Sequence, residues 1–114
     1  METTRLDNAA PYSAPGHHDM AAFRLQGHGA SSTEHFWVGL SHFLPGGGAE
    51  RSATPIEKVY VVVDGQLTFV TDEGEEVLGP LDSCRFAPGE ARTVENRSNR
   101  VASMLVVMPY PPAG

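Results

Sequence analysis

Short runs of β-branched and aromatic residues recur along most of this chain, and each run is closed by a turn rich in glycine, proline, aspartate or asparagine. Acidic-glycine pairs at 64–65 and 73–74 separate neighbouring runs and favour hairpins. The runs predict strands over residues 35–44, 58–63, 66–71, 76–78, 83–86, 92–95 and 102–108. We expect the first of these to end at the Pro-Gly-Gly-Gly of residues 45–48. Short strands at such spacing favour an all-β sandwich or barrel.

Length and charge restrict both the organisation and the partners of the chain. Its 114 residues, 40% of them apolar, suit one domain with one modest core. A net charge of −6 argues against nucleic-acid or anionic-membrane partners, because both require a basic face. The longest apolar stretches, Val59–Val63 and Met104–Met108, are far shorter than the ~20 residues that span a bilayer. A single cysteine, Cys84, and an N-terminus without a signal pattern favour the cytoplasm.

The first 20 residues differ in character from the rest. They mix small, polar and proline residues without a period, which predicts an arm that is flexible or exchanged with a second subunit. We therefore expect residues 21–114 to form the barrel. An all-β domain of this size leaves edge strands that need cover, so we expect a homodimer. The aromatic strand at Phe36 and Trp37, with the arm, is the expected contact surface.

Two spaced motifs resemble those of the cupin superfamily. The first, Gly-x5-His-x-His-x3-Glu-x6-Gly, corresponds with every interval kept to Gly46, Ser52, Thr54, Lys58 and Gly65. The second, Pro-x-Gly-x2-His-x3-Asn, corresponds to residues 87–96, with Arg92 at the histidine and Asn96 at the asparagine. The likeness covers residues 35–112 and is that of a small single-domain cupin. It implies a double-stranded β-helix, or jelly-roll barrel, with a pocket inside.

The metal ligands of the cupin motifs are replaced in this chain. In the family, the two histidines and the glutamate of the first motif and the histidine of the second hold a divalent metal. Here these positions carry Ser52, Thr54, Lys58 and Arg92. Hydroxyls are weak ligands for transition metals and two cations repel them, so we expect neither a metal nor another cofactor. One alternative stays open, a site rebuilt from His28, His42 and Glu57.

The family's former ligand positions also indicate a pocket. Lys58, Tyr60 and Val62 share one face of their strand, because side chains alternate between the two faces. The expected substrate-binding residues are Arg92, Ser52, Thr54, Phe86, Val62, Val94 and Met104, and the expected catalytic residues are Lys58, Tyr60 and His42. The guanidinium of Arg92 suits bidentate binding of a carboxylate or phosphate. For Lys58 a proton-transfer role, a fixed-cation role and a purely structural role all stay open.

These residues give three hypotheses for function. The first is a metal-independent lyase, isomerase or dehydratase acting on a small carboxylated metabolite, which Arg92 anchors while Lys58, Tyr60 or His42 moves a proton. A second is a non-catalytic small-molecule binding or sensing module. The third is a metal-dependent dioxygenase or decarboxylase that uses the rebuilt site. In all three the partner is a small molecule, and in the first it is anionic.

Overall fold

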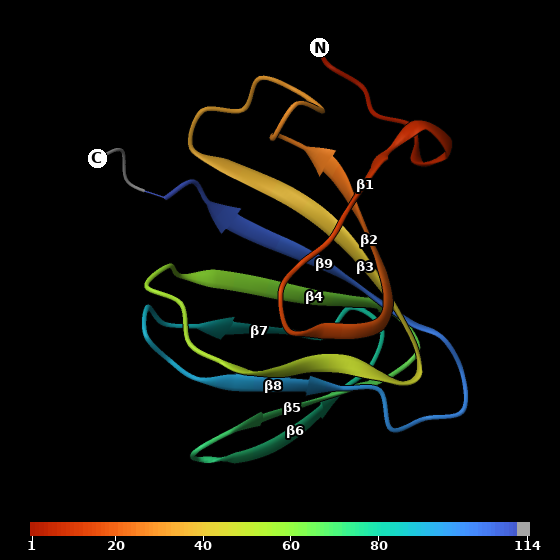
Figure 1. Cartoon of the computed structure of the whole chain (residues 1–114), viewed down its shortest axis with the longest axis vertical. Helices are drawn as coiled ribbons and strands as arrows, with labels where there is room; N and C mark the ends of the chain where they lie inside the picture. The colour runs from red at the N-terminus through yellow and green to blue at the C-terminus, as the bar shows by residue number, and fades with distance from the viewer. Residues whose placement is uncertain (112–114) are drawn as a thin grey trace.

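A computed structural model describes residues 1–111, and within them almost all regular structure is β-strand (Figure 1). The elements are a short 3-10 helix η1 (Leu6–Asn8) and strands β1 (Ala10–Tyr12), β2 (His17–Gln26), β3 (Phe36–Ser52), β4 (Lys58–Asp64), β5 (Leu67–Thr71), β6 (Gly74–Leu78), β7 (Ser83–Phe86), β8 (Arg92–Glu95) and β9 (Ala102–Pro109). The predicted all-β class is confirmed. Among the described elements there is no helix long and apolar enough to cross a membrane.

The long strand β3 is the element around which the barrel is built. Its first half pairs with β9 and its second half pairs with β8, while β2 runs along its other edge. From β9 the sheet continues to β4 and β7, and from β8 it continues to β5 and β6. Side chains from both branches meet in one buried cluster that includes Phe69, Val94, Val62 and Met104. The two branches therefore close on each other as a jelly-roll barrel, as predicted.

The prediction that the strand ends at residues 45–48 is wrong, because β3 runs through the glycines to Ser52. A Cβ on Gly47 would collide with the backbone oxygen of Asp19 in β2, and one on Gly48 with that of Val94 in β8. Both neighbouring strands therefore approach more closely than a side chain would allow. The glycines mark the place where β3 passes from one branch of the sheet to the other, and not a turn.

Strand β2 is absent from the predicted strands. Its sequence, His-His-Asp-Met-Ala-Ala-Phe-Arg-Leu-Gln, contains no β-branched residue, so local propensity gives little signal. In the structure β2 pairs with β3 over most of its length and with β1 through Ala10↔Arg24 and Tyr12↔Ala22. Much of the predicted arm is thus paired within this chain, and residue 20 lies inside a strand. Exchange of the arm between subunits and the homodimer itself stay predictions.

Asn96, the last residue of the second motif, ties β3 to the turn that follows β8. It is 1% exposed, and its Nδ2 donates to the carbonyl oxygens of Phe43 at 3.0 Å and Arg100 at 2.8 Å. Its Oδ1 accepts from the backbone N of Ser98 at 3.0 Å and from the Ser98 hydroxyl at 2.7 Å. A single buried amide therefore satisfies backbone groups from two parts of the barrel.

We expect Asn96→Ala to lower the free energy of unfolding by roughly 2–4 kcal/mol, because it removes the side-chain donor to the Phe43 carbonyl and the acceptor for the backbone N–H of Ser98. Urea denaturation of the purified variant measures the change. The matched control is Asn99→Ala, an exposed position in the same turn, which we expect to change stability by less than about 0.5 kcal/mol. Equal losses for the two variants would contradict this role of Asn96.

Candidate functional site

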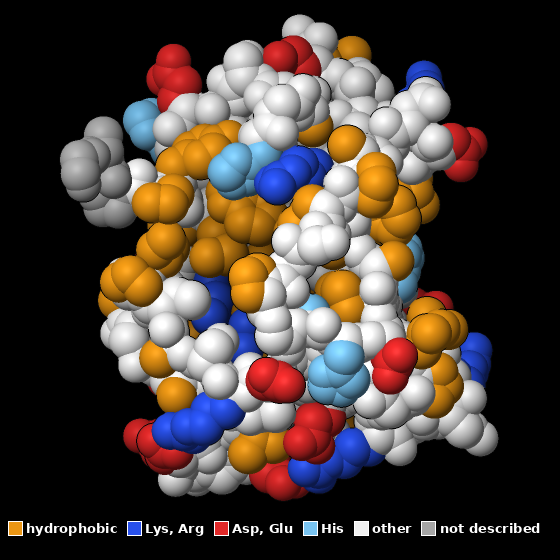
Figure 2. Space-filling model, viewed as in Figure 1, with side chains coloured by type: hydrophobic (Ala, Val, Ile, Leu, Met, Phe, Trp, Pro, Cys, Tyr) orange, Lys and Arg blue, Asp and Glu red, His pale blue; other side chains and the backbone are white. Residues whose placement is uncertain are grey.

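A cavity of about 460 Å³ lies between the sheet and the β1–β2 hairpin, and Figure 2 shows its opening as a hollow with apolar walls. Its lining comes from β1, β2, β3, β4, β8 and β9 and from the loops beside them. The floor is polar and carries Ser52, Thr54, Lys58, Tyr60 and Arg92. Met104 and Val106 belong to both the lining and the core, so the cavity rests directly on the packed interior.

Arg92 is only 4% exposed, and three hydrogen bonds hold its side chain at the floor of the cavity. Its Nε donates to the Tyr60 hydroxyl at 3.1 Å, and its Nη1 donates to the Ser52 hydroxyl at 3.0 Å and to the Glu50 carbonyl at 3.2 Å. Nη2 has no hydrogen-bond partner among the described residues. Because every fully buried side-chain nitrogen of these residues does have a partner, Nη2 is not fully buried. This nitrogen therefore opens on the cavity and is available to a ligand.

Lys58, the chain's single lysine, lies beside Arg92 and is 2% exposed. Its Nζ donates one long hydrogen bond of 3.5 Å to the Thr54 hydroxyl. Burial, and secondly the charge of Arg92, lower the pKa of Lys58 to about 8. The amine therefore exchanges its proton close to neutral pH, which an exposed lysine does not do.

Within residues 1–111 the two buried cations have no anionic partner. The ion pairs of the described residues join exposed or half-exposed side chains, and none of them includes Lys58 or Arg92. The described lining of the cavity contains no aspartate or glutamate, in a chain that has 14 acidic residues. A buried charge without a counter-ion is costly, so this floor is electrostatically matched to an anion.

Tyr60 fixes the side chain of Arg92 by accepting a hydrogen bond from its Nε. The Tyr60 ring forms a cluster with those of Phe69 and Phe86, whose centroids lie 5.8 Å and 5.6 Å from it and 6.3 Å from each other. Burial raises the pKa of Tyr60, although the charge of Arg92 and the hydrogen bond from it act in the opposite direction. The hydroxyl accepts a hydrogen bond from Arg92 and keeps its own proton, which it can donate to a bound molecule.

The structure brings together six of the residues singled out from the sequence and separates four. Those that line the cavity are Ser52, Thr54, Lys58, Tyr60, Arg92 and Met104. The side chains of Phe86, Val62 and Val94 lie beneath the floor, in the hydrophobic core. His42 does not line the cavity, because its neighbour Ser41 does and side chains alternate along β3. The ring of His42 instead bonds through Nδ1 to the Ser103 hydroxyl at 2.6 Å.

A second wall of the cavity was not found from the sequence. It is formed by Tyr12, His17, Met20, Ala22 and Arg24 of the β1–β2 hairpin and by His28 and Trp37. The alternation of Met20, Ala22 and Arg24 at every second position is the signal that could have revealed it. Within this wall His17 donates from Nδ1 to the Pro15 carbonyl at 2.9 Å. Burial lowers the pKa of His17, so its neutral form, with Nε2 as an acceptor, is favoured.

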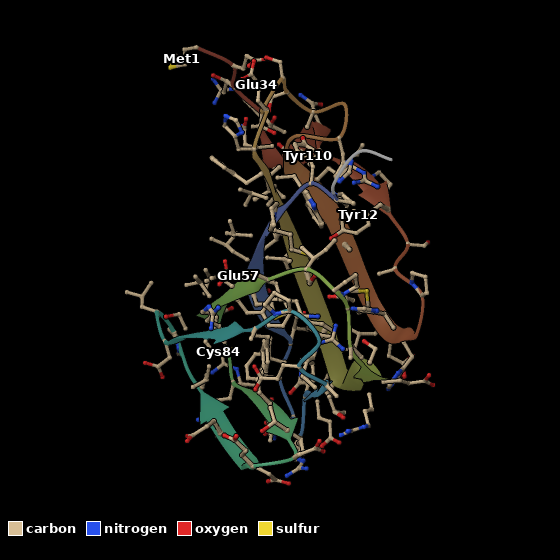
Figure 3. All side chains as sticks on the ribbon, turned by 90° about the vertical axis from the view of Figure 1, so that its left-hand side faces the viewer. Met1, Tyr12, Glu34, Glu57, Cys84 and Tyr110 are labelled. Atoms are coloured by element: carbon tan, nitrogen blue, oxygen red, sulfur yellow. The ribbon has the colours of Figure 1, made fainter. Side chains whose placement is uncertain are left out.

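The residues at the cupin metal positions do not fit a divalent metal. Two are hydroxyls and two, Lys58 and Arg92, are cations. The alternative set does not converge either, because His28 packs on Trp37 at the mouth whereas Glu57 pairs with Arg85. Figure 3 shows Glu57 on the side of the molecule away from Tyr12. Within residues 1–111 no three His, Cys, Asp or Glu side chains are grouped as metal ligands.

The jelly-roll barrel with an internal cavity defines a class of proteins that bind small ligands within a β-barrel. The model of the cupin domain (Cupin_2) matches residues 39–108, and the chain belongs to this family. It is 50% identical over 113 residues, or 99% of its length and 97% of the relative's, to a Mycobacterium tuberculosis protein named beta-D-galactosidase Rv1717.

Two solved structures with similar folds have different names. The polyketide cyclase RemF from Streptomyces resistomycificus has a TM-score of 0.86 at 20% identity, with 98% of this chain and 82% of that chain covered. A cupin-superfamily sugar phosphate isomerase from Silicibacter pomeroyi has a TM-score of 0.80 at 25% identity, with 95% of this chain and 75% of that chain covered. These likenesses establish a common barrel, and the reaction of such a barrel depends on the residues that line its cavity.

We expect the lowered pKa of Lys58 to make stability depend on pH. Because that pKa falls from 10.5 in the unfolded chain to about 8 in the fold, the unfolded state binds more protons between these values. The contribution of Lys58 to the free energy of unfolding therefore rises with pH across this window, and its full penalty is present below pH 8. Lys58→Met should stabilise the protein at pH 7 by on the order of 2 kcal/mol, and this advantage should vanish near pH 10.

Urea denaturation of the parent and Lys58→Met at several pH values between 7 and 10 measures this difference. Tyr12, Tyr60 and Cys84, whose pKa values burial raises, titrate in both proteins and largely cancel in the comparison. A difference that stays constant from pH 7 to pH 10 would mean that Lys58 titrates normally in the fold.

Proposed function

We propose that this cupin binds a small anionic molecule on Arg92 and Lys58 and converts it without a metal, as a lyase, isomerase or dehydratase. The observation that carries the proposal is the pair of buried cations, 4% and 2% exposed, that has no carboxylate partner among the described residues. A carboxylate or phosphate between them would offset the cost of burying both charges.

The floor offers a complete set of donors for such an anion. Nη2 of Arg92 and Nζ of Lys58 provide charge-assisted hydrogen bonds, and the Ser52 hydroxyl, which accepts from Arg92, can donate its own proton. The Thr54 hydroxyl donates to the Ile56 carbonyl and serves as an acceptor for Lys58. Arg92 is already fixed by Tyr60, Ser52 and the Glu50 carbonyl, so little side-chain entropy is lost when a ligand binds. Preorganised positive charge of this kind also stabilises negative charge that develops during a reaction.

Proton transfer beside the bound anion is the chemistry that these residues support. Lys58, whose pKa is about 8 before a ligand binds, is protonated beside a bound anion and, like the protonated hydroxyl of Tyr60, can donate a proton. The neutral imidazole of His17 would accept a proton from a carbon next to the carboxylate, and Lys58 or Tyr60 would then return a proton to the carbon skeleton or to a leaving group. This step is common to many isomerases, lyases and dehydratases. The fold shared with a sugar phosphate isomerase supports this reaction class.

Arg92→Ala should weaken binding of the anion more than Lys58→Ala does. Arginine offers parallel donors in a fixed plane, whereas lysine offers a point charge on a flexible stem. We expect a loss of 10- to 100-fold for Arg92→Ala, which corresponds to roughly 1.5–3 kcal/mol. Calorimetric titration with small carboxylates, sugar acids and sugar phosphates measures it, using whichever compound binds the parent most tightly.

Arg85→Ala is the matched control, because Arg85 forms an exposed pair with Glu57 outside the described lining of the cavity. This variant should bind the same compound as the parent does. If folded Arg92→Ala retains the parent's affinity, Arg92 is structural and the anion site is refuted. If no anion in the panel binds the parent at millimolar concentration, the proposal also fails.

Glycoside hydrolysis is a second candidate, which the name of the 50% identical relative favours. Most glycosidases need two carboxyl groups flanking the scissile bond, and the described lining of the cavity provides none. Hydrolysis would then require Tyr60 as nucleophile, a role that tyrosine has in some glycosidases. The neutral amine of Lys58 would accept the Tyr60 proton and pass it to the leaving alcohol, and water would then release the sugar from Tyr60.

This candidate predicts release of nitrophenol from 4-nitrophenyl β-D-galactoside by protein purified from a host that lacks its own β-galactosidase. Tyr60→Phe should abolish the release, and Arg85→Ala should leave it unchanged. A chelator should not alter it, because the family's metal positions hold no suitable ligands. Turnover that survives Tyr60→Phe would contradict hydrolysis by this cavity.

A further inference from the structure

Arg24 is a third cation in the cavity, at the opposite side from Lys58 and Arg92. In the register of the sheet Arg24 pairs with Gly39, Gly39 with Val106, and Val106 with Tyr60. These residues form one row across β2, β3, β9 and β4. At ~4.8 Å between neighbouring strands, the Cα atoms of Arg24 and Tyr60 are about 14 Å apart along the sheet. Arg24 therefore stands well away from the floor to which Tyr60 fixes Arg92.

The guanidinium of Arg24 is held in place by an aromatic ring and not by a carboxylate. Its Cζ lies 4.5 Å from the centroid of the Tyr12 ring. Tyr12 packs edge-on against Trp37 at 6.0 Å, and its hydroxyl occupies the space over Gly39, where a Cβ would lie 2.7 Å away. Within residues 1–111 Arg24 forms no ion pair. A cation–π contact of this kind uses no N–H hydrogen bond, so the guanidinium N–H groups of Arg24 stay available to a ligand.

The cavity wall between the two cationic ends is mainly apolar, with Ser41 as a polar exception between Ala22 and Met104. It is lined there by Met20, Ala22, Trp37, Met104, Val106 and Met108. Figure 2 shows the same arrangement, with a basic group at the upper rim of the hollow, apolar side chains within it and further basic groups deeper inside. Since the described lining contains no acidic residue, the electrostatic potential is positive at both ends of an apolar channel.

We propose that the natural ligand carries two anionic groups joined by a largely apolar linker, one bound by Arg92 and Lys58 and the other by Arg24. This inference rests on the proposed function, since it requires the floor to bind an anion. The side chains of the cations reach into the cavity from its two ends, so the two anionic groups lie closer together than the 14 Å between Cα atoms, roughly 6–10 Å apart. Among linear α,ω-dicarboxylates, those with six to nine carbons meet this spacing.

The test compares suberate with octanoate, which have the same chain length and differ in one terminal carboxylate. We expect suberate to bind the parent about tenfold more tightly, the value of one charge-assisted contact. Arg24→Gln should remove this advantage and leave the affinity for octanoate within twofold of the parent. Arg24→Lys should restore part of the suberate advantage relative to Arg24→Gln, because lysine supplies the positive charge but not the planar guanidinium. Arg85→Gln is the control outside the cavity.

Each outcome separates this inference from the proposed function. If octanoate binds in an Arg92-dependent manner and Arg24→Gln lowers the affinities for both ligands equally or not at all, the floor binds anions but Arg24 is not a second anion site. If octanoate binds and no dicarboxylate from adipate to azelate binds more tightly, the two-anion ligand is also refuted. Loss of the suberate advantage in Arg24→Gln alone supports it.

Discussion

The burial of two like charges in one small barrel is the constraint on which the rest of the site depends. Lys58 and Arg92 would repel each other and lose hydration, at a cost of several kcal/mol for each ion. The fold offsets part of this cost through Tyr60, Ser52 and the carbonyl of Glu50, and it packs Tyr60 on two further rings. These contacts satisfy Nε and Nη1 of Arg92 but supply no negative charge. The remaining positive potential is what a ligand can use.

The parts of this fold and site that follow from sequence are those encoded by local pattern or motif spacing. The strands at 83–86 and 92–95 have the expected bounds, and the motif frame brings Ser52, Thr54, Lys58 and Arg92 to one floor. What was missed depends on contacts between distant segments. Gly47 and Gly48 suggest a turn until β2 and β8 are known to flank them, and β2 has no β-branched residue to reveal it. His42 was expected in the cavity, but its position depends on which face of β3 points inward, and that face carries Ser41.

The two walls of the cavity have different origins. Cupin motif positions supply the floor, whereas the facing wall comes from β1 and β2, which lie before residue 39, where the family match begins. Specificity in this chain is accordingly expected to depend on Tyr12, Arg24 and Trp37 as much as on the floor.

Because cations replace the metal ligands of the family, the acid and the base of the proposed reaction have to be different residues of the cavity. Arg92 contributes to the lowered pKa of Lys58, and an anion bound between them would cancel that repulsion and raise the pKa again. With ligand present Lys58 would therefore stay protonated and act as a donor that stabilises developing negative charge. The base would then be a neutral group on the opposite wall. His17 meets this requirement, because its Nδ1 proton is bound by Pro15 and burial disfavours its charged form. An acid on the floor and a base on the hairpin would act on opposite sides of one substrate.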